Sequence, residues 1–107
     1  MKVILACLLF AAIAALNAPA IAADIEAGRV KAKPCNTCHG KDGIGTMPMF
    51  PNLAGQKSIY LAKQLVAFRD GSRKSEVMNI VVKALSDRDI ENLAAYYESL
   101  KSGGAPE

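Results

Sequence analysis

Apolar residues recur at helical spacing through the second half of the chain, which shows no strand-rich pattern. One helix is predicted over residues 58–70, with Ser58 as its N-cap and Gly71 just past its end. Another follows a capping-box pattern at residues 86–89, where an acid stands three residues after a serine, and ends at Gly103 and Gly104. The apolar positions of these two helices are Ile59, Leu61, Leu65, Val66 and Phe68, and Ile90, Leu93, Ala94, Tyr97 and Leu100.

Shorter helices and one long loop complete the predicted pattern. Residues 24–33 are expected to form a helix with acids at its start and bases at its end, which Pro34 stops. Residues 76–85 form a short apolar helical stretch that carries Met78. Residues 40–55 hold four glycines and two prolines and are therefore expected to be a loop. The fold class is thus all-α, with three main helices, one or two short ones and long loops.

The N-terminal segment has the pattern of a secretory signal peptide. Lys2 supplies a positive charge, residues 3–16 are apolar, and residues 17–22 are mostly small. The apolar run is shorter than the roughly 20 residues that span a bilayer, so cleavage after Ala22 or Ala23 is favoured over an uncleaved anchor. The prediction is a cleaved signal peptide over residues 1–22, one domain over residues 23–107, and a periplasmic location.

Charge argues against a nucleic-acid partner. The whole chain has a formal net charge of +3, and no run of five basic residues occurs. Loss of residues 1–22 removes one lysine and no acid, so the formal charge of the remaining domain is +3 − 1 = +2. A domain of about 85 residues buries a limited fraction of its surface and usually needs a covalent or cofactor staple.

The segment Cys35-Asn36-Thr37-Cys38-His39 carries the strongest chemical signal in the chain. A CxxCH motif is the attachment signature of c-type haem: each thiol adds to one porphyrin vinyl group, and the histidine becomes an iron ligand. A zinc site would need a fourth ligand that the exported part of the chain lacks. A disulfide between the two cysteines would leave the histidine unexplained. One covalently bound haem c, held by Cys35, Cys38 and His39, is therefore predicted.

The second axial iron ligand is predicted to be Met78. His39 is the only histidine, so the other protein ligand must be of another type. Met47 and Met49 follow His39 so closely that they would have difficulty reaching the opposite face of the haem. Met78 follows a full helix that can carry the chain round the haem edge. The alternative is that Met78 is only a flexible core side chain.

Residues 35–97 resemble small class I c-type cytochromes of the cytochrome c553 type, and also one half of a dihaem cytochrome c4. The matching segments are CNTCHGKDG, FPNLAGQ, YLAKQLVAFRDGSRK and LSDRDIENLAAYY. The resemblance implies the cytochrome c fold with one haem, Met78 as a ligand shortly after Arg73, and a Pro51 carbonyl that accepts a hydrogen bond from His39. It also implies a close crossing of the first and last helices at Gly28 and Tyr96 or Tyr97. Tyr60, Gln64 and Arg73 are candidate contacts to the haem edge or propionates.

The expected function is a soluble periplasmic carrier that moves single electrons by Fe(III)/Fe(II) exchange, and not an enzyme. Its expected partners are redox proteins, such as a membrane oxidoreductase or a terminal oxidase or reductase, with no small-molecule substrate and no nucleic acid. A catalytic or gas-binding haem protein would need an open iron site, usually with a distal histidine or arginine. The alternative that stays open is a haem c subunit docked permanently in a larger oxidoreductase complex.

Overall fold

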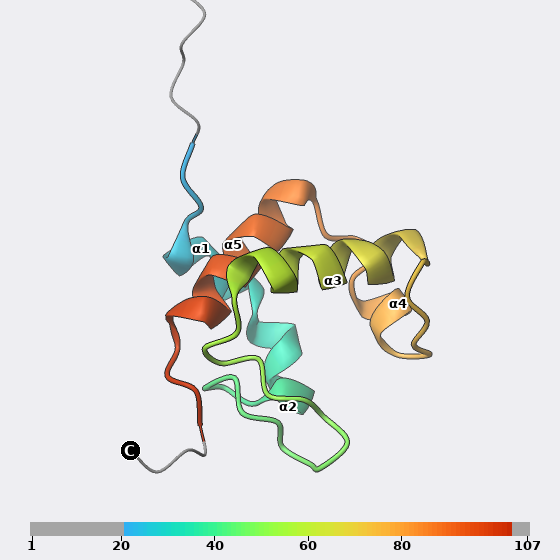
Figure 1. Ribbon diagram of the computed structural model, residues 1–107, viewed down its shortest axis with the longest axis horizontal. Helices are drawn as coiled ribbons and strands as arrows, with labels where there is room; N and C mark the ends of the chain where they lie inside the picture. Colours follow the sequence, from blue (N-terminus) through green and yellow to red (C-terminus); the bar gives the residue numbers. More distant parts are fainter. Residues whose placement is uncertain (1–20, 104–107) are drawn as a thin grey trace, which may run out of the picture.

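A computed structural model describes residues 21–103 (Figure 1). The elements are α1 (Ile25–Lys31), the 3-10 turn η2 (Lys33–Cys35), α2 (Asn36–His39), α3 (Ser58–Asp70), α4 (Met78–Val81) and α5 (Asp87–Ser99). Within residues 21–103 there is no β-strand, which confirms the all-α prediction. The predicted signal peptide falls on residues outside this range, apart from its last two. None of the described helices is long and apolar enough to cross a membrane.

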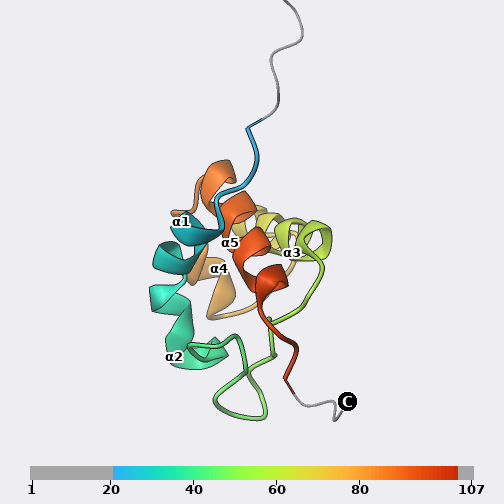
Figure 2. The same cartoon turned by 90° about the vertical axis from the view of Figure 1, so that its left-hand side faces the viewer.

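The three main helices form where the hydrophobic pattern predicts them, but the apolar face predicted for α3 is only partly correct, because Leu61 is buried whereas Ile59 is 87% exposed. α1 and α5 cross closely, and α3 packs across α5 (Figures 1 and 2). The buried core lies between these helices and consists of Ala32, Leu61, Leu93, Ala94, Tyr96 and Tyr97. Both views show α2 and α4 on the same side of α3, at different places along it. The short helices and loops therefore occupy one side of a frame built from α1, α3 and α5.

The crossing of α1 and α5 depends on Gly28. A Cβ atom at this position would lie 2.1 Å from the Asn92 carbonyl oxygen and 2.8 Å from Tyr96 Cβ. Two polar contacts secure the same crossing: the Asp24 N–H donates to Asn92 Oδ1 at 2.8 Å, and Lys31 pairs with an Asp89 carboxylate oxygen at 3.4 Å. The glycine expected at this crossing is confirmed, with Tyr96 as its aromatic neighbour.

Several helix boundaries differ from the sequence prediction. α1 ends at Lys31 and not at residue 33, and α5 ends at Ser99, with Leu100 extended, and not at Gly103. Ser58 is not the N-cap of α3: Lys57 takes that position and contributes no side-chain cap. Instead, a Glu98 carboxylate from α5 accepts the Ser58 N–H, so a negative charge from another helix serves the positive end of the α3 dipole. The helix predicted over residues 76–85 is regular only in α4, although turn hydrogen bonds from Ser75 to Leu85 flank it.

The start of α5 is formed as predicted. Ser86 is the N-cap, its hydroxyl accepts the Asp89 N–H at 3.0 Å, and the Asp89 carboxylate accepts the Ser86 N–H at 3.0 Å. Such a reciprocal capping box satisfies two backbone donors that the helix itself leaves unpaired. α5 supplies more fully buried residues than any other described helix. The capped helix α5 therefore provides the surface on which α1 and α3 pack.

Candidate functional site

The CxxCH segment lies on η2 and α2, directly after α1. Pro34 is the second residue of the 3-10 turn, where its missing N–H costs no hydrogen bond, and the chain continues into α2. Cys35 and His39 are four residues apart, so the helical turn places them on one face, and Cys38 lies three residues after Cys35 on the same turn. Both cysteines are partly buried free thiols. The structure thus brings the two thiols and the imidazole together in one compact turn.

His39 is held by a single well-defined hydrogen bond. Its side chain is buried, and Nδ1 lies 2.8 Å from the Pro51 carbonyl oxygen. Because a carbonyl can only accept, Nδ1 must carry the proton, which leaves Nε2 with the free lone pair that binds a metal. Such a bond fixes the ring and raises the basicity of the ligating nitrogen. This is the contact that the resemblance implied for Pro51.

The loop after His39 is attached to α2. The Thr46 N–H donates to the Cys38 carbonyl at 2.9 Å, and the Thr46 hydroxyl lies 3.1 Å from the same oxygen. The Phe50 N–H then donates to the Met47 carbonyl and closes a turn. Met47 and Met49 are 50% and 65% exposed. Both methionines therefore belong to a segment held against the His39 side of the site.

Cys35 packs against the core cluster that contains Tyr97. Burial raises the pKa of the Cys35 thiol, and the Tyr97 phenol also has a raised pKa, first because of burial and then because of Cys35. At neutral pH Cys35 is therefore a protonated thiol in an apolar setting. Covalent haem c requires two thiols and one imidazole with a free Nε2, in a partly apolar surrounding, and the site provides all of these. The residues present fit that group.

Met78 is the first residue of α4 and is half buried. Its N–H donates to the Ser75 hydroxyl at 3.1 Å, which caps the start of the turn. Asn79, the next residue, makes three side-chain hydrogen bonds to backbone groups between Phe68 and Ser75. The sequence carried no signal for this role, since an asparagine in a short apolar helix has many uses.

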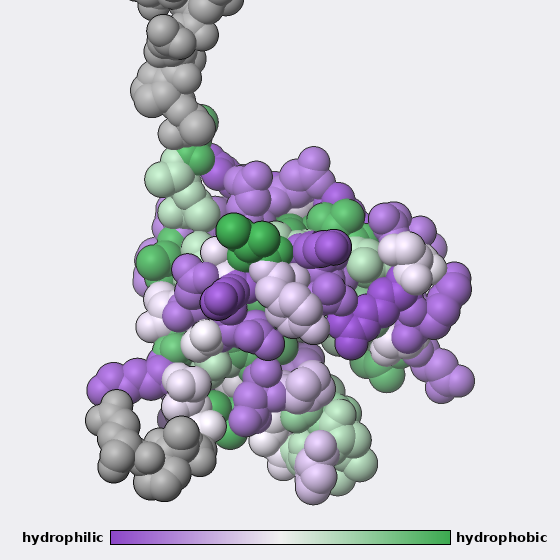
Figure 3. Space-filling view, viewed as in Figure 1, coloured by the Kyte–Doolittle hydropathy of each residue, from purple (hydrophilic) through white to green (hydrophobic). Residues whose placement is uncertain are grey.

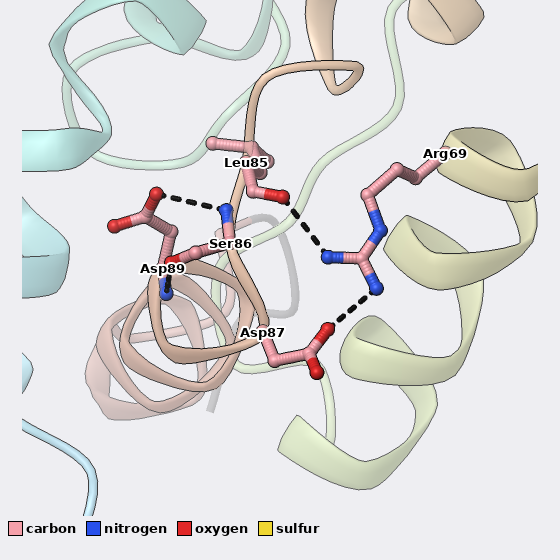
Figure 4. A network of polar contacts seen from close by, with 5 residues as sticks. All are labelled: Arg69, Leu85, Ser86, Asp87 and Asp89. Atoms are coloured by element: carbon pink, nitrogen blue, oxygen red, sulfur yellow. Dashed lines mark hydrogen bonds and ion pairs between the residues drawn. The ribbon is translucent and has the colours of Figure 1, made fainter.

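A polar network joins the end of α3 to the start of α5 (Figure 4). In the chain, α4 lies between these two helices. Arg69 donates to the Leu85 carbonyl at 2.9 Å and to the Asp87 carboxylate at 2.6 Å. The Arg69 side chain is 26% exposed, whereas that of Asp87 is 86% exposed. The bond to Leu85 therefore lies in the less hydrated part of the network, and it fixes the chain just before the α5 cap.

The candidate haem-edge residues lie mostly on α3. Arg73 Nη1 donates to Gln64 Oε1 at 2.7 Å, and the Arg73 guanidinium lies 4.5 Å from the centre of the Phe68 ring. Tyr60 is 47% exposed. Figure 3 shows a mostly hydrophilic face with hydrophobic atoms near the start of α3, where Ile59 is 87% exposed. The structure brings Gln64 and Arg73 together, and their role toward a propionate stays a prediction.

Residues 25–101 match the family model described as Cytochrome c. The chain is 46% identical to cytochrome c-554(548) of Halomonas halodenitrificans, over 73% of this chain and 98% of that protein. It is 45% identical to cytochrome c4 of Pseudomonas aeruginosa, over 75% of this chain and 40% of that protein. A protein named thiosulfate dehydrogenase electron acceptor, from Thiomonas intermedia, is 43% identical over 71% of this chain and 36% of its own length.

The structural comparison gives the same picture. Reduced cytochrome c4 of Pseudomonas stutzeri superposes with a TM-score of 0.71 and 44% identity, over 75% of this chain and 47% of that one. The chain thus spans nearly the whole Halomonas cytochrome but less than half of these two cytochromes c4. The resemblance to one half of a cytochrome c4 is confirmed, and so is the cytochrome c fold. This chain belongs to the cytochrome c family, whose members carry electrons on a covalently attached haem c.

Proposed function

We propose that the chain is exported by a cleaved signal peptide and works in the periplasm as a soluble one-electron carrier, with Cys35 and Cys38 as thioether links and His39 and Met78 as axial ligands. The observation that carries this is the bond from His39 Nδ1 to the Pro51 carbonyl, beside two free thiols. It presents Nε2 of a buried, oriented imidazole to a metal. Bound haem would supply the Fe(III)/Fe(II) couple, and the protein fixes and encloses it.

Met78 is favoured over the other described methionines as the second ligand. Met47 follows directly on Thr46, which is bonded to the Cys38 carbonyl on the His39 side. Met47 and Met49 are 50% and 65% exposed, whereas Met78 is less exposed than either and opens α4. With Met78 and His39 both holding the iron, the thioether would favour Fe(II), and electron transfer would need little rearrangement of the protein.

The experiment is optical spectroscopy of the haem-loaded protein in both oxidation states. We expect low-spin spectra, a ferric iron–thioether charge-transfer band, and no shift of the ferrous spectrum with carbon monoxide. Met78→Ala should abolish the band and admit carbon monoxide. Met49→Ala is the matched control and should change neither. A high-spin wild-type spectrum that responds to carbon monoxide would overturn the proposed ligation and favour ligand binding or catalysis at iron.

Soluble export has its own test. Intact-mass measurement of the periplasmic protein should give a chain that begins at Ala23 or Asp24 and carries one haem. A chain that retains residues 1–22 and sediments with the membranes would contradict this part of the proposal.

A second candidate is a haem subunit of an oxidoreductase complex, or a dedicated electron acceptor for one. Two matches favour it: the Thiomonas relative named as an electron acceptor, and a domain of a thiosulfate dehydrogenase structure from Marichromatium purpuratum, which superposes with a TM-score of 0.66 and 34% identity. Gel filtration of the native periplasmic extract discriminates the two. A free carrier elutes near its monomer mass, and a permanent subunit elutes with a larger complex.

A further inference from the structure

Residues 71–77 connect α3 to Met78 and have little burial to hold them in place. Figure 1 shows this segment as the loop at the far end of α3 that turns back beneath the helix to α4. Most of its residues are exposed, and none is buried. Apolar contacts therefore contribute little to fixing the loop, and its position must come from hydrogen bonds.

Arg73 ties the first half of this loop to α3 through its N–H, which donates to the Ala67 carbonyl at 3.0 Å, and its guanidinium, which donates to Gln64. The second half, which leads to Met78, is closed by the side chain of Asn79. Asn79 Nδ2 donates to the Phe68 carbonyl at 2.7 Å and to the Arg73 carbonyl at 2.8 Å, while Oδ1 accepts the Ser75 N–H at 2.7 Å. All three partners have fixed roles as donor or acceptor, so the amide has only one orientation that satisfies them. An aspartate of the same shape could accept from Ser75 but could donate to neither carbonyl.

The same contacts tie α4 to the end of α3. Phe68 lies in the last turn of α3, where carbonyls have no partner within the helix. The Ser75 hydroxyl accepts the Met78 N–H at 3.1 Å, and its carbonyl accepts the Asn79 N–H at 3.2 Å. The other end of α4 is held by Val82, which is buried and whose N–H donates to the Met78 carbonyl at 3.1 Å. Ser75 and Asn79 therefore fix the start of α4, where Met78 lies, relative to a long helix packed on the core.

We propose that Asn79 is a positioning residue for iron ligation: its side-chain amide holds the 71–79 loop closed and so keeps Met78 at the iron. The inference rests on the axial ligation proposed above. An external ligand reaches the iron only when the thioether withdraws, and withdrawal requires this loop to open. The hydrogen bonds of Asn79 therefore set how often Met78 leaves.

Imidazole titration of the ferric haem-loaded protein measures this directly. Imidazole binds iron as Met78 departs, with no change of oxidation state, and the iron–thioether band disappears. We expect Asn79→Ala to keep the band without imidazole but to raise the apparent imidazole affinity about tenfold, the effect of losing one or two such hydrogen bonds. Asn79→Asp should act in the same direction. If the alanine variant fails to load haem, the aspartate variant replaces it in the imidazole titration.

Two controls separate positioning from a general effect on stability. Asn92→Ala removes a comparable asparagine that joins α5 to the Asp24 N–H. It should lower the stability of the fold yet leave imidazole affinity within twofold of wild type. In a Met78→Ala background, Asn79→Ala should have no further effect, because the ligand through which it acts is already gone.

The outcomes are distinct. Unchanged imidazole affinity in both Asn79 variants overturns the inference, and so does an effect that persists undiminished without Met78. A change in Asn92→Ala as large as that in Asn79→Ala would also overturn it, because imidazole affinity would then follow global stability. If Met78→Ala retains the thioether band, the proposed ligation itself is wrong, and the failure lies there and not in the loop.

Discussion

Gly28→Ala tests the helix crossing on which the whole frame depends. The added Cβ would lie 2.1 Å from the Asn92 carbonyl oxygen, 2.6 Å from the Asn92 carbonyl carbon and 2.8 Å from Tyr96 Cβ. Two of these atoms are backbone, and the third is the first side-chain carbon, so no change of rotamer relieves the contact. The helices must move apart by about 1 Å to restore normal van der Waals separation.

The expected cost follows from three terms. Overpacking in a close contact costs about 1–3 kcal/mol, and here the upper end applies because backbone atoms are involved. Separation of the helices also weakens the bond from the Asp24 N–H to Asn92, worth about 1 kcal/mol. Alanine returns about 0.5–1 kcal/mol through its higher helix propensity. The net loss is about 3 kcal/mol, or about 12–24 °C in melting temperature for a domain of this size.

Guanidinium unfolding of the haem-loaded protein, followed by circular dichroism, measures this loss. Gly71→Ala is the control: its Cβ would meet nothing closer than 3.6 Å, but its φ of +84° is unfavourable for alanine. That variant should lose only about 1–2 kcal/mol. A Gly28→Ala protein as stable as wild type would refute the close crossing, since helix propensity alone would then decide the result.

Three further predictions concern the contacts of Figure 4. Ser86→Ala removes the cap of α5 and should cost about 1 kcal/mol in denaturant unfolding. The pKa of Asp89 is lowered from the usual 3.8, chiefly by the hydrogen bond from the Ser86 N–H, so its stabilisation is present above that value and lost as the pH falls through the folded-state pKa. Asp89→Asn should make the melting temperature less dependent on pH in acid. Arg69→Ala should lower the free energy of unfolding by about 1 kcal/mol. About half of this loss should remain in high salt, because salt screens the ion pair with Asp87 but not the hydrogen bond to the Leu85 carbonyl. Asp87→Asn should lower the free energy of unfolding by about 0.5 kcal/mol.

The sequence predicted the main helices because their apolar faces and caps are local features. Ser86 and Asp89 form the capping box that their spacing indicated, and α3 ends at a left-handed Gly71. The start of α3 could not be predicted in the same way. Its cap is the carboxylate of Glu98, forty positions away, and no local pattern marks a partner that only tertiary packing supplies.

The candidate site likewise has features that the local sequence predicts and features that depend on tertiary contacts. Cys35, Cys38 and His39 are close together in the chain, so the motif alone predicts their chemistry, and the structure places them on one turn. The attachment of the following loop through Thr46 could not be predicted, because it depends on a backbone carbonyl in α2. The hydrogen bonds of Asn79 reach back as far as Phe68 and carry no motif.

In the proposed ligation, the two axial ligands are held by different means, with a consequence for redox behaviour. His39 is fixed within α2 and by the Pro51 carbonyl, both parts of a segment tied together by short-range contacts. Met78 is fixed through a mostly exposed loop closed chiefly by hydrogen bonds. Local opening follows the less buried region, so ligand loss should begin at Met78 while His39 stays bound. Changes in the 71–79 loop can therefore alter how readily the thioether leaves without disturbing haem attachment.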